Sequence, residues 1–393
     1  MRDVNTNRKK ELSLYIHIPF CVKKCDYCDF LSTTGDRKTK DAYVNALIEE
    51  IKGYEDIGQE YIVKNIFFGG GTPSAIEGEQ IYRIMETIKE IFTIASTDKS
   101  NLVPEISLEM NPGIISKEKL QWYKKAGINR LSIGLQSCDN KELKLLGRIH
   151  SYEEFLDNYK LAKELGFDNI NIDLMSALPG QNLDGWMNNL ELVTKLNPEH
   201  ISCYSLIIEE GTPFYDRYHD IEENDELDRL LYSRTREFLK EKGYLQYEIS
   251  NYSKENHECK QNLTYWTLGD YLGMGLGSSS LINNVRFHNE TNLEEYMECI
   301  NKKKDIRREI TPLTIKQKME EFMFLGLRLT KGICRDEFYQ IFQTDIEDVY
   351  GDVIKQSMKE GLLLGKDNRI YLTTKGMDLS NIVMVRFLFD EAE

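Results

Sequence analysis

The stretch YIHIPFCVKKCDYCDF, residues 15–30, decides the fold and carries the chemistry of this chain. Cys21, Cys25 and Cys28 follow a C-x3-C-x2-C spacing, directly after an apolar, β-branched run that predicts a buried strand over 12–18. Three thiolates on one short loop can bind three irons of a [4Fe-4S] cube and leave the fourth iron open to a ligand that is not protein. The spacing therefore predicts such a cluster.

Two other uses of these cysteines fit the sequence less well. A zinc knuckle needs a fourth Cys or His nearby, and none occurs in the ten residues after Cys28, while His17 falls within the predicted strand. A disulfide with one spare thiol is typical of secreted chains. The opening residues, MRDVNTNRKKE, contain no apolar signal core.

Length and charge limit the class of protein. A chain of 393 residues predicts two or three domains, because single cores rarely grow past about 250 residues. The net charge of -15 argues against a nucleic-acid partner, since phosphate binding depends on clustered Lys and Arg. No stretch approaches the ~18 apolar residues of a membrane span. We therefore expect a cytoplasmic protein whose membrane contact, if any, is transient and peripheral.

Short apolar runs alternate with helical patterns through the first half of the chain. Six strands joined by helices predict a parallel sheet, and six units are too few to close an eight-fold barrel. We therefore expect an α/β fold, a (β/α)6 partial barrel. The predicted strands are 12–18, 65–74, 104–113, 130–137, 169–180 and 200–208, and the predicted helices are 40–54, 79–92, 116–127, 151–166 and 184–197.

The same patterns suggest how the domains are divided. A tail over 1–11 precedes the barrel, which we expect to run over 12–243 and to end in an acidic helix over 222–243. A linker over 244–310 follows. From about Thr311 helices and a hairpin-like end over 361–373 predict a small, mostly helical, winged-helix-like domain, 311–393.

Polar residues gather at the ends of the predicted strands, where chemistry sits in parallel α/β sheets. The cysteines follow the first strand, and Gly69-Gly70-Gly71-Thr72-Pro73 follows the second, where missing side chains let backbone amides approach a ligand. Glu109 comes at the end of the third strand, the fourth strand ends in Gln136, and the fifth strand carries Asp173. Carboxylates at apolar strand ends are costly to bury unless they bind something. These residues together predict a ligand site at the barrel mouth.

Several stretches, taken together, resemble a known family. YIHIPFCVKKCDYCDF, FFGGGTPS, LEMNPG, RLSIGLQS, LGRIH and NIDLMSALPGQ, in this order and spacing, look like the oxygen-independent coproporphyrinogen III oxidase family of radical S-adenosylmethionine (SAM) proteins. Within it the chain is most similar to the HemW type, the haem chaperones. The resemblance runs from Leu12 to beyond Leu329, where EEFMFLGLRLTKGI resembles the opening of the family's C-terminal domain.

The resemblance implies a ligand set. It implies that Cys21, Cys25 and Cys28 bind the cluster and that SAM occupies the open iron, where an electron from the cube cleaves its carbon–sulfur bond. In the oxidase, part of the SAM-binding set serves a second SAM. The SAM contacts implied here are Tyr15, Tyr27, Gly70, Gly71, Thr72, Glu109, Gln136, Arg148 and Asp173.

A later stretch points to haem. CKQNLTYWTLGDYLGMGLGSSS, residues 259–280, resembles a HemW stretch with a His-Asn-x-x-Tyr-Trp motif linked to haem binding, but Gln261 stands where that His would be. The other residues of the motif, Asn262, Tyr265 and Trp266, are present. The resemblance implies that they line an apolar slot and stack on a porphyrin. We expect the glycine-rich end, 273–280, to be flexible. Candidate replacement axial ligands are Cys259, His257 and His288.

The resemblance implies a haem chaperone that hands its cargo to apo-haemoproteins, with any turnover of SAM auxiliary. Two alternatives share the cluster: oxidative decarboxylation of coproporphyrinogen III, and anaerobic haem degradation. The oxidase type has a further cysteine two positions after the third ligand, where this chain has Phe30. It also has a longer N-terminal segment than the eleven residues that precede the first strand here. Both departures favour the chaperone.

Overall fold

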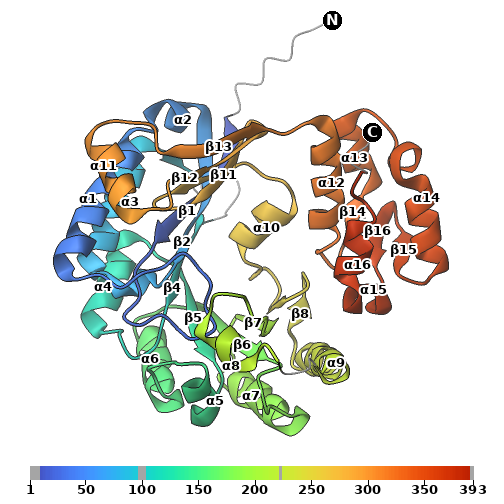
Figure 1. Ribbon diagram of the computed structural model, residues 1–393, viewed down its shortest axis with the longest axis horizontal. Helices are drawn as coiled ribbons and strands as arrows, with labels where there is room; N and C mark the ends of the chain where they lie inside the picture. Colours follow the sequence, from blue (N-terminus) through green and yellow to red (C-terminus); the bar gives the residue numbers. More distant parts are fainter. Residues whose placement is uncertain (1–8, 96–102, 221–223, 390–393) are drawn as a thin grey trace, which may run out of the picture. The chain divides into compact units, whose positions relative to one another are not determined.

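The computed structural model describes residues 9–95, 103–220 and 224–389, so most of the expected tail over 1–11 and the start of the acidic helix lie outside the described residues (Figure 1). The chain forms two compact units. Unit 1 comprises Met1–Leu174, Ile207–Glu222 and Gly269–Thr311, and unit 2 comprises Met175–Leu206, Glu223–Leu268 and Pro312–Glu393.

Parallel strands form the centre of unit 1, in the side-by-side order β1, β2, β4, β5, β6. Helices connect them, which confirms the predicted α/β class, with element ends shifted by a few residues. The strands are β1 (Lys10–Ile18), β2 (Tyr61–Gly70), β3 (Thr93–Ile94), β4 (Glu105–Met110), β5 (Arg130–Gln136) and β6 (Asn169–Ser176). The helices are α1 (Arg37–Lys52), α2 (Glu55–Glu60), α3 (Gly78–Ile91), α4 (Lys117–Ala126), α5 (Asn140–Leu145), α6 (Tyr152–Glu164) and α8 (Pro213–Tyr218).

Local sequence explains where these helices begin and end. Ser116 accepts a hydrogen bond from the Lys119 backbone N–H at the start of α4, and Gly127 ends that helix in the left-handed region with φ of 97°. Ser151 and Glu154 form a capping box at the start of α6. The helices therefore end where their own side chains and glycines stop them, which is why these bounds were predictable.

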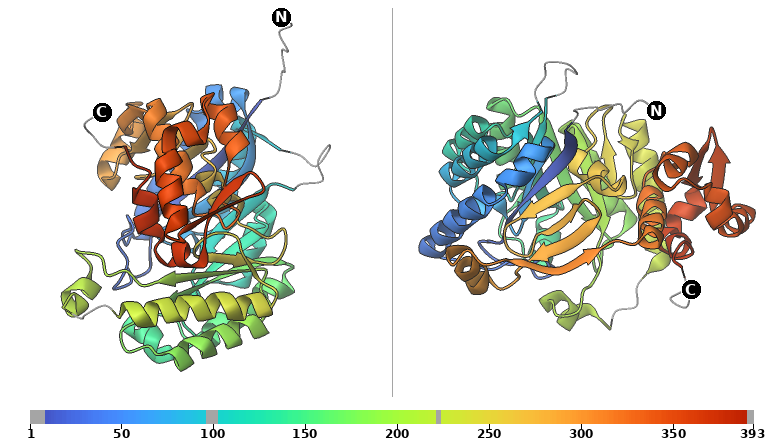
Figure 2. Two further views of the ribbon diagram at one scale, coloured as in Figure 1. Left: turned by 90° about the vertical axis from the view of Figure 1, so that its right-hand side faces the viewer. Right: turned by 90° about the horizontal axis from the view of Figure 1, so that it is seen from above.

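The sheet of unit 1 continues beyond β1 into a region predicted to be a linker (Figure 2). β10 (Tyr271–Met274) pairs with β1 in parallel, and β11 (Ser279–Ile282) and β12 (Val285–Asn289) follow antiparallel. The expectation that 273–280 is flexible is wrong, because most of these residues are buried in this hairpin. A Cβ on Gly273 would lie 2.3 Å from the Ser279 carbonyl oxygen, so close backbone packing explains that glycine. The remaining elements here are α11 (Leu293–Asn301) and β13 (Arg307–Pro312).

A buried carboxyl joins this extension to α1. Glu50 accepts hydrogen bonds from the Gly275 backbone N–H at 2.8 Å, from the Asn289 amide at 2.8 Å and from the Tyr296 hydroxyl at 2.5 Å. Its side chain lies away from solvent, and this burial raises the pKa of Glu50 to about 7. One carboxyl thus connects a helix near the N-terminus with a hairpin and a helix more than two hundred residues later.

Unit 2 holds α7 (Leu183–Lys195), β7 (His200–Ser205), α9 (Asp225–Glu241), β8 (Leu245–Gln246), β9 (Asn251–Ser253) and α10 (Lys260–Trp266). β7 and β9 pair antiparallel, and Trp186 of α7 donates to the Thr235 hydroxyl of α9 at 2.7 Å. The acidic residues at the start of α9, Asp225, Glu226 and Asp228, lie in its first turn. Among the described residues, no helix is long and apolar enough to cross a membrane.

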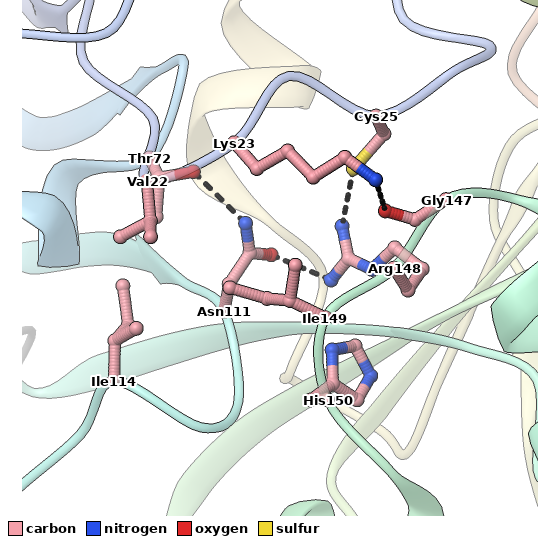
Figure 3. A pocket seen from close by; sticks show the side chains of 10 residues that line it. All are labelled: Val22, Lys23, Cys25, Thr72, Asn111, Ile114, Gly147, Arg148, Ile149 and His150. Carbon is pink, nitrogen blue, oxygen red and sulfur yellow. Dashed lines mark hydrogen bonds between the residues drawn. The ribbon is translucent and has the colours of Figure 1, made fainter.

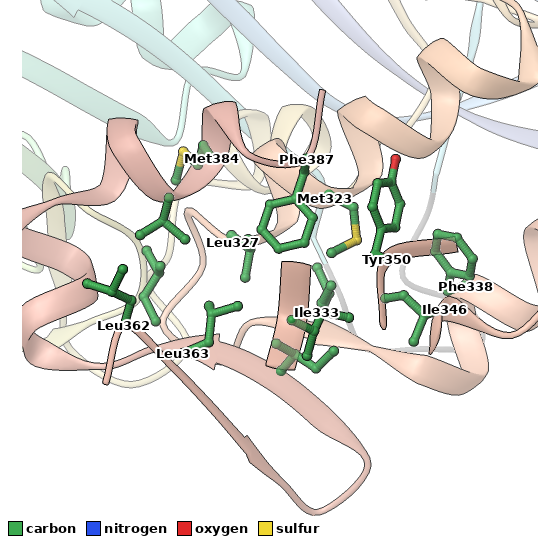
Figure 4. Packing of buried hydrophobic residues seen from close by; sticks show 14 of the residues in the cluster. Met323, Leu327, Ile333, Phe338, Ile346, Tyr350, Leu362, Leu363, Met384 and Phe387 are labelled. Atoms are coloured by element: carbon green, nitrogen blue, oxygen red, sulfur yellow. The ribbon is translucent and has the colours of Figure 1, made fainter. Parts of the chain in front are cut away.

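The C-terminal part of unit 2 packs around one apolar cluster, in which Met323, Leu327, Phe338, Tyr350 and Phe387 are buried (Figure 4). The hairpin predicted over 361–373 is present as β15 and β16. The elements are α12 (Ile315–Gly326), β14 (Ile333–Cys334), α13 (Arg335–Phe342), α14 (Ile346–Lys359), β15 (Leu363–Lys366), β16 (Arg369–Leu372), α15 (Thr374–Asp378) and α16 (Ser380–Val385).

Candidate functional site

The cysteine loop leaves β1 and is held at several points within unit 1. The Cys21 backbone N–H donates to the Thr33 carbonyl at 2.9 Å, and the Cys28 N–H donates to the Cys25 carbonyl at 3.2 Å. Asp26 anchors the middle of the loop, because its backbone N–H donates to the Leu146 carbonyl and its carboxylate lies 2.6 Å from the Arg217 guanidinium. Asp26 was not predicted, since nothing local marks its partners.

The three thiols lie close enough for their charges to interact. Burial raises the pKa of the Cys28 thiol, and negative charge on Cys25 and Cys21 raises it further. Thiolates held together in this way fit a cationic iron cluster, which would relieve their repulsion. Within the described part of the chain, no three His, Cys, Asp or Glu side chains converge on one metal ion. A cube does not require such convergence, because each thiolate binds a different iron.

The glycine-rich turn after β2 packs directly on the first strand and the cysteine loop. A Cβ on Gly69 would lie 2.9 Å from the Tyr15 ring, and one on Gly70, whose φ is +115°, would lie 2.7 Å from the His17 ring. At Gly71 the Cβ would meet the Cys21 sulfur at 3.0 Å. Gly69 and Gly70 therefore make room for side chains of β1. Gly71 leaves space beside the Cys21 sulfur, to which a cluster would bind.

A chain of hydrogen bonds runs from Cys25 to Thr72 (Figure 3) and continues from Thr72 to Cys21. Arg148 donates to the Cys25 sulfur at 3.4 Å and to the Asn111 amide oxygen at 2.8 Å. The Asn111 amide donates to the Thr72 hydroxyl at 2.8 Å, and that hydroxyl lies 3.5 Å from the Cys21 sulfur. Asn111 was not among the predicted site residues, although it stands two positions after Glu109 in the LEMNPG stretch.

These residues line a pocket beside the loop. His150 also lines it and is neutral at ordinary pH, because burial and the nearby Arg148 charge lower its pKa to about 3. Lys23 donates to the Gly147 carbonyl at 3.3 Å. The lining residues are Val22, Lys23, Cys25, Thr72, Asn111, Ile114, Gly147, Arg148, Ile149 and His150.

The two predicted carboxylates, Glu109 and Asp173, are close enough for their negative charges to repel. The Asn171 amide donates to Asp173 at 2.7 Å, and the Ser132 hydroxyl donates to it at 3.4 Å. Burial, together with the negative charge of Asp173, raises the pKa of Glu109 to about 8. Glu109 is therefore largely protonated near neutral pH and is poised to ionise when a cation binds.

The remaining predicted residues of unit 1 come from different elements: Gln136 ends β5, Tyr15 lies within β1, Tyr27 is in the cysteine loop and Arg148 follows α5. Gln136 adopts a left-handed φ of 75° beside a bulge in β5. A Cβ on Gly134 would come within 3.2 Å of the Gln136 amide, the Arg148 guanidinium and the Asn111 amide oxygen, so these three side chains converge over that glycine. Burial raises the pKa of Tyr27, which shares a side-chain hydrogen bond with Arg148.

The residues predicted to contact haem lie elsewhere in the fold. Asn262, Tyr265 and Trp266 are on α10 in unit 2, together with the buried Gln261. Of the three candidate axial ligands, Cys259 and His257 belong to unit 2 and Cys259 is buried. His288 is in β12 of unit 1, where its ring lies 3.6 Å from Glu309.

The resemblance implies that Glu109 contacts SAM, and if this carboxylate pairs with the SAM ammonium, its raised pKa predicts a pH-dependent affinity. A cationic ammonium needs the ionised carboxylate, so affinity should be lost as pH falls through about 8, by up to about tenfold per unit. Equilibrium dialysis of cluster-loaded protein against labelled SAM would measure this. Glu109→Gln should weaken binding and flatten the pH profile relative to wild type, whereas the exposed Glu118→Gln should not. The ammonium of SAM titrates alike in all three proteins, so a wild-type profile parallel to that of Glu109→Gln would contradict the assignment.

Comparison with known proteins identifies similar chains. The radical SAM superfamily model matches residues 15–193, and the HemN C-terminal domain model matches residues 313–379. The heme chaperone HemW of Bacillus subtilis is 36% identical over 96% of this chain and 99% of that protein. HemW of Escherichia coli is 40% identical over 68% of this chain and 69% of that protein. The solved structure of coproporphyrinogen III oxidase (HemN) from Escherichia coli has a TM-score of 0.83 and 25% identity, covering 96% of this chain and 90% of that one.

Proposed function

This chain belongs to the HemW family within the radical SAM superfamily, and from that membership we propose that it is a haem chaperone, a cytoplasmic protein that binds haem and delivers it to apo-haemoproteins, respiratory ones included. The observation that carries the proposal is identity of 36% with a heme chaperone along nearly the whole length of both chains. Phe30, in place of the oxidase-type cysteine, supports the same choice over decarboxylation.

In this proposal the barrel mouth of unit 1 holds the cluster and SAM. Cys21, Cys25 and Cys28 would bind the cube, and Arg148 would stabilise the Cys25 thiolate through the hydrogen bond that it already donates. When bound, the cube supplies an electron that can cleave the carbon–sulfur bond of SAM. The position of Gly71 beside the Cys21 sulfur supports this assignment.

The remaining residues of the mouth would bind SAM. Glu109 would pair with its ammonium, and backbone groups of Gly70, Gly71 and Thr72 would hold its amino-acid end. The side chains of Gln136, at the end of β5, and Asp173, within β6, would bind the ribose. The convergence of Gln136, Arg148 and Asn111 over Gly134 supports a polar recess at this place.

Haem would bind at α10, through Asn262, Tyr265 and Trp266. Tyrosine and tryptophan offer flat apolar faces for a porphyrin. A Gln261 amide is a poor ligand for haem iron, so the axial ligand must come from another residue. Of the two candidates in unit 2, the partly exposed His257, three residues before α10, is more accessible to solvent than the buried Cys259.

The function is tested by giving anaerobically reconstituted protein haem in one vial and reduced coproporphyrinogen in another. We expect haem to bind and then to pass, chemically unchanged, to an apo-haemoprotein. We expect no reaction of the porphyrinogen. Trp266→Leu should reduce haem binding, whereas Trp122→Leu, on α4 of unit 1, should not. Vinyl formation with release of carbon dioxide would identify an oxidase instead, and opening of the haem ring would identify a degrading enzyme.

A further inference from the structure

An arginine of the C-terminal segment stacks on the tryptophan of α10. The guanidinium carbon of Arg328, just beyond α12, lies 4.3 Å from the centroid of the Trp266 ring. Guanidinium groups stack readily on indole faces, and such stacking keeps their edge N–H groups available. Both residues belong to unit 2, and Arg328 is among the residues matched by the HemN C-terminal domain model.

The hydrogen-bonding capacity of Arg328 is unused. Within the residues that the structure describes, its guanidinium donates no hydrogen bond, although it carries five N–H donors. The nearest carboxylate, Glu248, lies 3.8 Å away, beyond hydrogen-bond distance. The Nε1 of Trp266 and the Nε of Arg328 are buried donors for which the described part of the chain offers no acceptor. The side chain of Arg328 is 27% exposed, whereas that of Glu248 is 1% exposed.

Other arginines of the same unit show what a dedicated ion pair looks like here. Arg335 lies 2.6 Å from Glu347, and Arg386 lies 2.7 Å from Glu360, both within hydrogen-bond distance. Glu248 instead accepts hydrogen bonds from the Ser250 backbone N–H at 3.1 Å and from the Asn251 amide. Glu248 therefore stabilises the turn that contains Ser250 and Asn251. Its carboxylate lies near Arg328 but forms no hydrogen bond with it among the described residues.

Arg328 is fixed to the same scaffold as α10. The next residue, Leu329, forms a β-bridge with Glu248, and the Thr330 backbone N–H donates to the Tyr247 carbonyl at 3.0 Å. The hydroxyl of Tyr247 in turn accepts from the Asn262 amide at 3.4 Å. Arg328 and the residues of α10 are thus positioned by one short segment, 246–248.

We propose that Arg328, stacked on Trp266, binds a carboxylate of the cargo, which in haem is a propionate. The proposal rests on the proposed function and adds a polar anchor to its apolar slot. A planar guanidinium with free N–H groups matches a carboxylate in a bidentate geometry that a lysine ammonium does not reproduce. Stacking on Trp266 places this charge beside a ring suited to the porphyrin edge.

The test compares haem with haem dimethyl ester, which keeps the iron and the ring but lacks free carboxylates. Soret-band titrations of the full chain would give both affinities for wild type, Arg328→Met, Arg328→Lys and the control Arg229→Met, which removes an exposed arginine of α9. We expect wild type to prefer haem by about tenfold or more, because charge-assisted hydrogen bonds are lost with the ester. Arg328→Met should lose the preference, Arg328→Lys should retain part of it, and Arg229→Met should retain it fully.

The ratio of the two affinities also separates the possible failures. Partial unfolding of a variant lowers binding of both ligands, so it leaves the ratio unchanged. Equal binding of haem and ester by wild type, or an unchanged preference in Arg328→Met, would overturn the carboxylate site while leaving the chaperone function intact. Binding of neither ligand by wild type would overturn the proposed function and, with it, the site.

Discussion

Cys25→Ala is expected to abolish assembly of the cluster, with loss of iron, of acid-labile sulfide and of the visible absorbance after anaerobic reconstitution. Two thiolates cannot hold a cube that already leaves one iron without a protein ligand. Cys25 suits this test better than Cys21, because Cys25 is partly exposed whereas the buried Cys21 sulfur packs against Gly71 and Thr72. Loss of the Cys25 thiol therefore changes the ligand set with little effect on packing.

The matched control is Cys334→Ala. Cys334 is equally intermediate in burial and stands before α13 in unit 2, where its side chain makes no capping hydrogen bond. We expect this variant to take up iron and sulfide as wild type does. Full iron and sulfide content with an unchanged spectrum in Cys25→Ala would show that the loop does not bind the cluster.

Glu50→Ala is expected to destabilise unit 1 by about 2 kcal/mol or more, at about 1–3 kcal/mol for each of two buried donors left without an acceptor. The donors that lose their acceptor are the Gly275 N–H and the Tyr296 hydroxyl, whereas the Asn289 amide keeps the Gly275 carbonyl and the Ser278 hydroxyl as acceptors. Denaturant unfolding of the apoprotein would measure the change. Glu49→Ala is the control, because Glu49 is exposed on the same helix and forms an exposed ion pair with Lys52. A loss no larger in Glu50→Ala than in Glu49→Ala would show that the network carries little stability.

The same carboxyl predicts the direction of a pH effect. The pKa of Glu50 is raised to about 7 by burial, so the folded state binds a proton that the unfolded state releases near pH 4.5. Its contribution to stability is therefore complete below about pH 4.5 and is lost as pH rises through about 7. Glu50→Gln should flatten the stability profile over this interval. An equally steep fall in both proteins would assign the effect to another group.

Local chemistry accounts for the parts of the structure that the sequence predicted. The alternation of apolar runs and helical patterns placed β1, β2, β4, β5 and β6 and the longer helices between them, because strand and helix periodicity are local properties of the chain. It missed the two-residue β3 and the short helices α2, α5 and α8. Ser116 and Gly127 marked the ends of α4 by capping and by a left-handed turn. The rule that ligands bind at the carboxyl ends of parallel strands then led to Glu109, Gln136 and Asp173 without any knowledge of their contacts.

What the sequence determined by itself is the cysteine loop, the order of strands and helices, and the family. Only the tertiary structure decided that β10 pairs with β1, that Arg148 reaches Cys25 across 123 residues, and that Arg328 stacks on Trp266. Periodicity and caps act over a few residues, whereas a pairing between distant segments depends on how completed elements pack. A glycine run such as 273–280 is therefore read as flexible until a neighbouring strand is known to bury it.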